Sequence, residues 1–161
     1  MTKNKLIRNI QKTLSKGDVS ITQPAGCKAL SLYLFNPDVL EGPLSHDEAQ
    51  AVVAEPAYWS FCWASGQALA RYILQNPELV AGKRVLDFGA GSAIVAIAAA
   101  KAGAKRAIAC DIDHDALDAA KANAMLNGVK IETSDDLDKV LDEVDVIVAA
   151  DVLYDPENMP F

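Results

Sequence analysis

Residues 84–93 constrain the fold of this chain more than any other stretch, because an apolar run ends in a carboxylate, Asp87, and a turn of small residues follows. A strand that leads into a glycine-containing loop and then a helix is typical of a ligand-binding loop at the carboxyl edge of a parallel sheet. Gly89 and Gly91 lack Cβ atoms, so the turn can adopt dihedral angles closed to other residues. A dinucleotide fingerprint needs a third glycine at position 94, which is Ile94, and a nicotinamide or flavin site is therefore excluded.

The rest of the chain after this loop alternates between short apolar runs and helical patterns. Strict alternation of strands and helices predicts an α/β fold with a parallel sheet and right-handed crossovers. We expect a Rossmann-like sheet of strand order 3-2-1-4, with helices on both faces. The expected strands are 84–88, 106–110, 130–133 and 144–149, and the expected helices are 65–75, 93–102, 115–127 and 137–141.

The first third of the chain is predicted to be an N-terminal extension, not an independent domain. Apolar residues at helical spacing predict an amphipathic helix over 3–15, ended by Gly17. Alternating leucines between positions 30 and 34 predict a short strand, and Ser45 with Glu48 forms a capping box for a helix over 46–54. We therefore divide the chain into an extension or lid, 1–55, and a ligand-binding domain, 56–161.

The fourth predicted strand raises a question about the edge of the sheet. Its residues 144–149 are almost continuously apolar, yet only residues 150–161 follow it. Soluble proteins avoid leaving such a strand as an open edge. We expect either that the chain is the front portion of a longer product, whose domain is incomplete at its C-terminal end here, or that another element covers this edge.

Composition narrows the classes of partner. A net charge of −7 argues against a nucleic acid bound through its phosphates, because no basic stripe exists beyond the N-terminal lysines and Arg8. Three widely spaced cysteines without a paired C-x-x-C motif indicate neither a disulfide framework nor a zinc site, and His46 and His114 show no metal-binding pattern. With no signal peptide or apolar run of membrane-spanning length, we expect a soluble, cytoplasmic protein without a membrane partner.

Asp111 is a candidate ribose-binding residue, since it ends the second strand 22 residues after Gly89. An acidic side chain at about this spacing reaches two vicinal hydroxyls. The alternative is a carboxylate at a helix N-terminus, a role that suits Asp113 or Asp115 better. If Asp111 binds ribose, Ile112 lies against the adenine face.

The loop resembles the first motif of the class I S-adenosylmethionine (SAM) dependent methyltransferases, through Asp87, Gly89, Ala90 and Gly91. The resemblance implies that Asp87 lies near the methionine amino group of SAM. It also implies that the loop passes under the ribose and the carboxylate. Ala93 replaces the usual third glycine of the family, and we expect tighter packing there without loss of binding.

Two further segments resemble a narrower subgroup, the lysine methyltransferases that modify the electron transfer flavoprotein beta subunit and other proteins. The segment 56–70 carries Trp63, which this resemblance places against SAM, although a large aromatic residue is also commonly part of a core. Residues 151–154 match its D-x-x-Y motif. Asp151 would hold or align the acceptor amine and Tyr154 would supply a wall or a hydroxyl, and the alternative is a plain turn before Pro156.

Two more residues complete the expected site. Ala150 is small, as the meeting point of cofactor and substrate requires, and Asp135 follows the third strand, where family members bind the adenine amino group. For Asp135 a solvated helix cap is equally compatible with the sequence.

The resemblance implies an enzyme, a SAM-dependent N-methyltransferase that methylates protein lysine by in-line displacement. Bacterial proteins described as nicotinamide N-methylases belong to the same subgroup, so a small-molecule amine acceptor is an alternative. A non-catalytic SAM-binding module is another. No metal site is expected.

Overall fold

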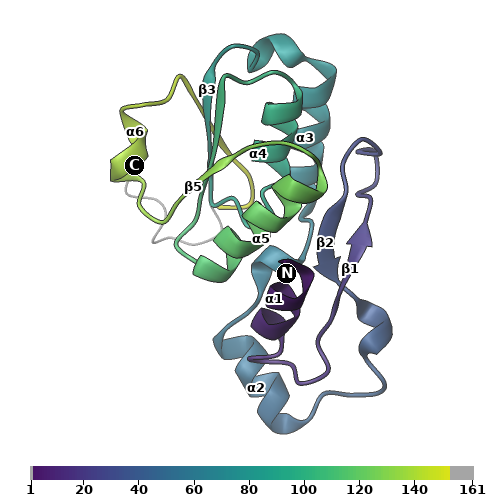
Figure 1. Ribbon diagram of the computed structural model, residues 1–161. Helices are drawn as coiled ribbons and strands as arrows, with labels where there is room; N and C mark the ends of the chain where they lie inside the picture. The colour runs from purple at the N-terminus through teal and green to yellow at the C-terminus, as the bar shows by residue number, and fades with distance from the viewer. Residues whose placement is uncertain (1, 153–161) are drawn as a thin grey trace.

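The computed structural model describes residues 2–152 (Figure 1). The elements alternate as the sequence predicts after residue 63, and a helical and hairpin segment precedes them. In chain order they are α1 (Thr2–Ile10), β1 (Val19–Thr22), β2 (Leu32–Phe35), η1 (Pro37–Val39), α2 (His46–Ala54), η2 (Tyr58–Ser60), α3 (Ala64–Gln75), η3 (Pro77–Leu79), β3 (Arg84–Phe88), α4 (Ile94–Lys101), β4 (Arg106–Cys110), α5 (His114–Leu126), β5 (Glu132–Ser134), α6 (Asp138–Leu141) and β6 (Val146–Ala149).

The main sheet has the order β5-β4-β3-β6, and all of its strand pairs are parallel. This confirms the predicted order 3-2-1-4 and the Rossmann-like class. Strands β3 and β4 have the predicted bounds. The ends of β5, β6 and helices α3 to α6 differ from the predicted ones by no more than two residues. Because all four strands run in one direction, their carboxyl ends meet at one edge, where α/β proteins bind ligands.

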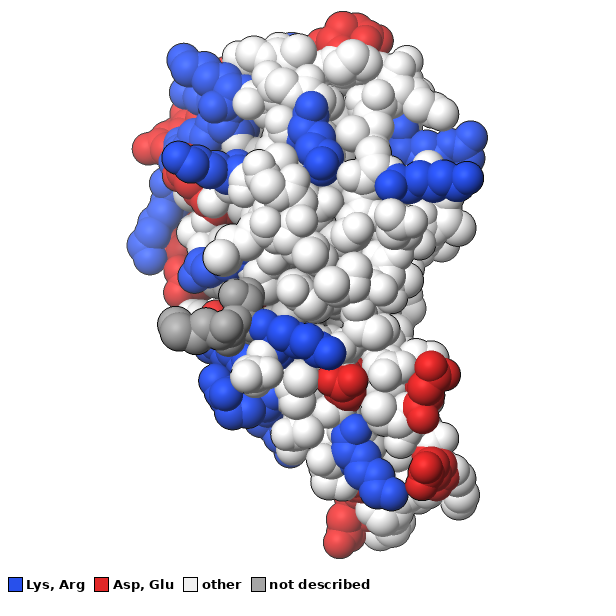
Figure 2. Space-filling view, turned by 45° about the vertical axis from the view of Figure 1, so that its right-hand side comes forward, with Lys and Arg blue, Asp and Glu red and all other residues white. Residues whose placement is uncertain are grey.

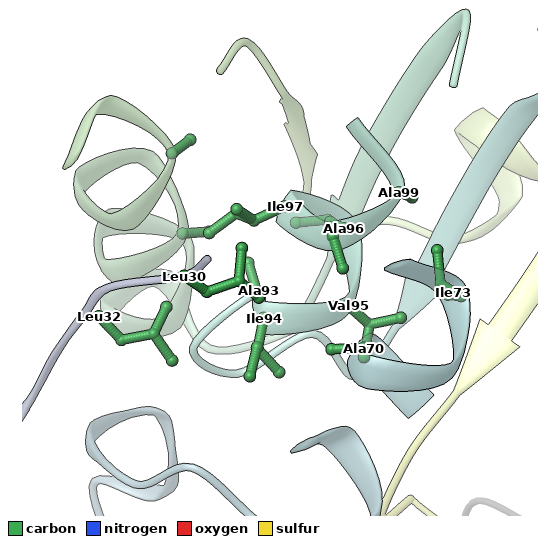
Figure 3. Close-up of a cluster of buried hydrophobic side chains, with 14 of the residues drawn as sticks. Leu30, Leu32, Ala70, Ile73, Ala93, Ile94, Val95, Ala96, Ile97 and Ala99 are labelled. Carbon is green, nitrogen blue, oxygen red and sulfur yellow. The ribbon is translucent and has the colours of Figure 1, made fainter. Parts of the chain in front are cut away.

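Helices cover the two faces of this sheet unequally. Alternate side chains of the strands, including Val85 and Ala109, face α3, α4 and α5 and form the larger core cluster. Figure 3 shows Leu30 and Leu32 from the N-terminal segment reaching the same cluster, beside Ala93 and Ile94. The opposite face carries a smaller cluster against α6.

The N-terminal segment forms a second lobe below the sheet in Figure 1, built from α1, α2 and the antiparallel β1–β2 hairpin. The capping box of α2 is confirmed, since Ser45 and Glu48 each bond the backbone of the other. Helix α1 ends at Ile10, earlier than predicted, because the chain folds back and a Cβ at Gly17 would overlap the Ile10 side chain. Strand β1 was not predicted from the sequence.

Two asparagines, Asn123 on α5 and Asn127 directly after it, bond the backbone of β2 and of the residue before it. Asn123 is fully buried; its Oδ1 accepts from the Tyr33 backbone N–H at 2.7 Å, and its Nδ2 donates to the Ser92 carbonyl at 3.0 Å. One turn later, the Asn127 side chain accepts from Ser31 N–H at 3.0 Å and donates to the Ser31 carbonyl. Helix α5 therefore satisfies backbone groups that a third strand would otherwise satisfy.

Basic side chains of α1 and of the turn after it also contact α5. Lys5 and Lys12 form ion pairs with Asp118 and Asp115, each at 2.6 Å. Across the described part of the chain, none of the helices has both the length and the apolar character needed to cross a bilayer.

Replacing Asn123 with alanine leaves the Tyr33 N–H and the Ser92 carbonyl buried without their partner. We expect the free energy of unfolding to fall by about 2 kcal/mol, the usual cost of an unsatisfied buried polar group. Urea denaturation followed by circular dichroism measures this change. Lys121→Ala, at an exposed position of the same helix, is the control and changes stability by less than about 0.5 kcal/mol; equal stability of the two variants contradicts the role of Asn123.

Candidate functional site

The candidate site lies where β3, β4 and β6 end at the carboxyl edge of the sheet. The loop after β3 is held against β4, since the backbone N–H groups of Gly89 and Ala90 both donate to the Cys110 carbonyl, at 2.9 and 3.1 Å. Asp111 follows β4 directly, and Ala150 and Asp151 follow β6. The structure thus brings together at one edge the loop and the carboxylates predicted from three separate sequence segments.

Asp111 connects β4 to the glycine loop. Its Oδ2 accepts from the Gly91 N–H at 2.8 Å and its Oδ1 accepts from the Asp113 N–H at 3.0 Å. Burial raises the pKa of the Asp111 carboxyl, against the lowering effect of these two hydrogen bonds. Each carboxylate oxygen has a second lone pair, so both can accept one further hydrogen bond from a ligand.

Of the neighbouring aspartates, Asp113 takes the helix-capping position that the sequence analysis considered for it. Asp113 is the N-cap of α5, and its side chain accepts from the Asp115 N–H at 2.8 Å. The helix-capping role therefore belongs to Asp113. Ile112, between the two, is 90% exposed and presents an apolar side chain beside the Asp111 carboxylate.

Asp87 lies on the face of β3 that packs against α4. It is 2% exposed, and its Oδ2 accepts from the Ala96 N–H at 2.9 Å, in the first turn of that helix. Burial raises its pKa to about 8, and the nearby negative charge of Asp111 adds to this rise. Besides its expected role toward a cationic ligand, this carboxyl anchors the start of α4, which the sequence did not indicate.

The loop after β3 has glycines where other residues would be strained or would clash with a neighbouring side chain. Gly89 and Gly91 have φ angles of +66° and +50°, in the left-handed region that favours glycine. A Cβ at Gly89 would overlap the Val152 side chain, so the turn after β6 lies directly over this residue. Ala93, the fully buried N-cap of α4, also adopts a left-handed conformation, with φ of 60°.

Trp63 belongs to a group of exposed aromatic side chains beside this edge. It is 48% exposed, its Nε1 donates to the Tyr58 carbonyl at 3.1 Å, and its ring lies 6.0 Å from that of Tyr58 and 5.9 Å from that of Phe61. Trp63 is therefore not a core residue. Tyr58 and Phe61 were not predicted as site residues, although their spacing in the segment 58–63 is the signal that could have found them.

Two close approaches place this aromatic segment at the site. A Cβ at Gly91 would lie 3.9 Å from Trp59 Cα, and one at Gly66 would lie 3.9 Å from the Ala150 Cβ. The aromatic segment therefore approaches the glycine loop, and the first turn of α3, which follows it, approaches the turn after β6.

A cavity of about 270 Å³ adjoins this segment, between α1, the residues before η2 and the start of α5. Trp59 lines the cavity, and so does the ion pair of Lys12 with Asp115. The N-terminal segment thus contacts the same aromatic segment that contacts the glycine loop.

The remaining predicted residues are less constrained. Asp151 is exposed and has a φ of 56°, and Asp135 is exposed directly after β5. Tyr154 lies outside the described residues. Among residues 2–152, no group of three or more histidine, cysteine, aspartate or glutamate side chains is arranged to hold a metal ion.

Comparison with known proteins agrees with this geometry. Residues 67–156, more than half of the chain, match the ribosomal protein L11 methyltransferase family. Similar proteins include the electron transfer flavoprotein beta subunit lysine methyltransferase of Homo sapiens, 43% identical over 103 residues, which are 62% of this chain and 39% of that protein. The ribosomal protein L11 methyltransferase of Serratia proteamaculans is 46% identical over 79 residues, or 48% of this chain and 27% of that protein.

A solved structure agrees at the level of the fold. The 16S rRNA N2 G1207 methyltransferase of T. thermophilus, in complex with AdoMet and guanosine, has a TM-score of 0.53 and 19% identity, covering 83% of this chain and 32% of that one. The solved structure agrees with a Rossmann-like fold, and the family match places the chain in a family of methyltransferases. The chain belongs to the ribosomal protein L11 methyltransferase family, and it spans about 40% of the length of the lysine methyltransferases that it resembles.

Asp87→Asn tests the buried carboxyl. The unfolded side chain titrates near pH 4 and the folded one near pH 8, so the folded state holds the proton more tightly. The contribution of Asp87 to the free energy of unfolding is therefore fully present below about pH 4 and is lost as the pH rises toward about 8, by at most about 1.4 kcal/mol per pH unit. Asparagine keeps an oxygen acceptor for Ala96 but does not titrate.

Urea denaturation at several pH values in this window measures the difference. We expect the Asp87→Asn variant to become the more stable protein as the pH rises. Asp142→Asn, at an exposed position, is the control and follows the wild-type pH dependence. If the free energy of unfolding of the wild type changes with pH in the same way as that of Asp87→Asn, the raised pKa of Asp87 is contradicted.

Proposed function

We propose that this chain binds SAM at the carboxyl edge of its parallel sheet and takes part in methyl transfer to a lysine side chain of a protein. The proposal rests on one observation: the candidate binding residues share the carboxyl edge of the sheet. The ligand-binding loop, the Asp111 carboxylate and the turn with Asp151 all lie there, beside exposed aromatic side chains.

The chemistry of these residues fits SAM. The cofactor supplies a methyl group on a positively charged sulfur. In our proposal Asp111 accepts hydrogen bonds from the ribose hydroxyls through its remaining lone pairs, and Ile112 and Trp63 cover the adenine and the cofactor. Asp87 faces the cationic amino group, and the loop 89–91, Asp135 and Ala150 complete the binding residues.

In the proposed reaction the protein mainly positions the acceptor amine and the methyl donor. The acceptor nitrogen uses its lone pair to form a bond to the methyl carbon while the carbon–sulfur bond breaks, and the nitrogen gives up its proton to water. Asp151 aligns the amine, and Tyr154 adds a wall or a hydroxyl group. Holding two reactants in line supplies most of the rate enhancement in such a displacement.

The named relatives support a protein acceptor. One is described as a lysine methyltransferase for the electron transfer flavoprotein beta subunit, and another as a methyltransferase for ribosomal protein L11. For the present chain, we propose a protein amine in preference to a small-molecule amine.

The proposal also covers the cellular compartment, the partners and the role of residues 1–55. We propose the cytoplasm, which the three free cysteines, Cys27, Cys62 and Cys110, support because reducing compartments keep thiols unpaired. We propose neither nucleic acid nor membrane as a partner, in keeping with the net charge of −7. Residues 1–55 would act as an extension or lid over the site, as their contact with α5 supports.

Isothermal titration with SAM tests the cofactor assignment. The wild-type chain should bind SAM, and Asp111→Ala should abolish measurable binding because both ribose contacts and the Gly91 contact are lost. Asp111→Asn keeps one acceptor for Gly91 and should weaken binding about tenfold to hundredfold, the usual effect of losing a charge-assisted hydrogen bond.

Asp113→Ala is the matched control for this titration, because it removes the same charge two residues away but not the acceptor. It should bind SAM within about threefold of wild type, a change of less than 1 kcal/mol. Unchanged affinity in Asp111→Ala removes the ribose assignment, and an equal loss in Asp113→Ala assigns the effect to general charge or helix capping.

Transfer of a labelled methyl group from SAM into a cell extract tests the acceptor. We expect label in protein, at lysine, and about a hundredfold less with Asp151→Ala, since positioning of the amine is lost while SAM still binds. Exposed Asp142→Ala is the control and retains activity.

The distribution of the label separates the competing functions. Label in small solutes instead of protein indicates a small-molecule N-methyltransferase. SAM binding without transfer to any fraction indicates a binding module without catalysis.

A further inference from the structure

A groove lies at the end of the sheet opposite the candidate site. It has a volume of about 650 Å³ and is formed where β4 and β5 begin and α5 ends. Its lining combines basic and apolar residues: Lys105, Arg106, Ala107, Lys121, Ala124, Met125, Val129, Lys130, Ile131 and Glu132. The site described above uses none of these residues.

The charge of the groove contrasts with that of the chain. Four of the lining residues are basic and one is acidic, in a chain whose net charge is −7. Arg106 is committed to ion pairs with Glu132 and Glu143. Lys105, Lys121 and Lys130 are exposed, and within the described residues they form no ion pair. Figure 2 shows several basic side chains around an uncharged area in the upper part of the view, with acidic ones at the top and along the left edge.

The floor of the groove is apolar. Met125 is 70% exposed at the end of α5, and Val129 and Ile131 are partly exposed beside it. Methionine side chains adapt to irregular apolar partners and are common on binding surfaces. The groove therefore suits a ligand that carries negative charges and apolar groups together.

The neighbouring strand adds a third feature. Strand β5 is an edge strand, which pairs with β4 on one side and with no strand of residues 2–152 on the other. Backbone groups along such an edge can bind an extended peptide. A nucleic acid fits the groove less well. Its phosphates could pair with the three lysines, but the apolar floor offers them no partner and the net negative charge of the chain repels them.

We propose that this groove is a docking site for an acidic, partly apolar segment of a partner protein. Carboxylates of the segment pair with Lys105, Lys121 and Lys130, and its apolar side chains pack on Met125 and the adjoining floor. Because the groove lies at the amino ends of the strands, about 15 Å from the carboxyl edge for a strand of this length, both surfaces can be occupied at once. The inference does not depend on the proposed methyl transfer.

The probe for this site is a fluorescein-labelled ten-residue peptide of alternating glutamate and valine, measured by fluorescence anisotropy with the whole chain. We expect binding that the double variant Lys121→Glu/Lys130→Glu weakens at least about tenfold, since attraction becomes repulsion at two positions. Met125→Ser should weaken binding about threefold or more through loss of the apolar contact, and a glutamine–valine peptide should not bind.

Lys16→Glu/Lys28→Glu is the matched control, with the same change of net charge at two exposed positions outside the groove. It should retain binding within about threefold, because screening weakens distant charges at physiological salt. Thermal unfolding of each variant verifies that it is folded.

Three results overturn the proposal: no binding of the glutamate–valine peptide, an equal loss in both double variants, or tighter binding of a ten-nucleotide single-stranded RNA than of the peptide. SAM titration of the groove variants keeps the two proposals distinguishable. Groove variants that lose the peptide but bind SAM as wild type support docking at a separate surface.

Discussion

The hydrogen bond from the Gly91 N–H to the Asp111 carboxylate sets the geometry on which the candidate site depends. It joins the loop after β3 to the end of β4, so the two segments move as one unit. The same carboxylate also accepts from the Asp113 N–H, which fixes the entry into α5. A ligand that bonds Asp111 therefore meets a carboxylate whose orientation is already determined, and little conformational entropy is lost when it binds.

The sequence predicts this edge well because the signals are local. An apolar run that ends in Asp87 or Asp111 predicts both a strand and a candidate site residue near its carboxyl end, and the order β5-β4-β3-β6 confirms the predicted arrangement of the strands. Contacts between distant segments could not be predicted in this way. The hydrogen bond of Asp87 to Ala96 depends on how α4 packs. Strand β1 alternates apolar and polar residues over only four positions, Val19–Thr22, a short signal that becomes a strand through its pairing with β2.

The two ends of the sheet differ in character. The carboxyl edge joins carboxylates with exposed aromatic rings, whereas the amino end joins lysines with an apolar floor. A net charge of −7 describes neither end, because it averages over both. Composition can exclude a class of partner for the whole chain, but the surface that a partner meets is set by the placement of a few side chains.

The amides of Asn123 and Asn127 have a consequence for how the chain opens. Asn123 bonds Tyr33 of β2 and Asn127 bonds Ser31, the residue before β2, while Asn123 also donates to the Ser92 carbonyl directly after the glycine loop. The Asn123 side chain thus connects the hairpin to the residue that follows the glycine loop through two hydrogen bonds. We therefore expect the N-terminal lobe and the loop to share one unit of local unfolding, so that hydrogen exchange at Tyr33 is linked to the order of the loop nearly sixty residues away.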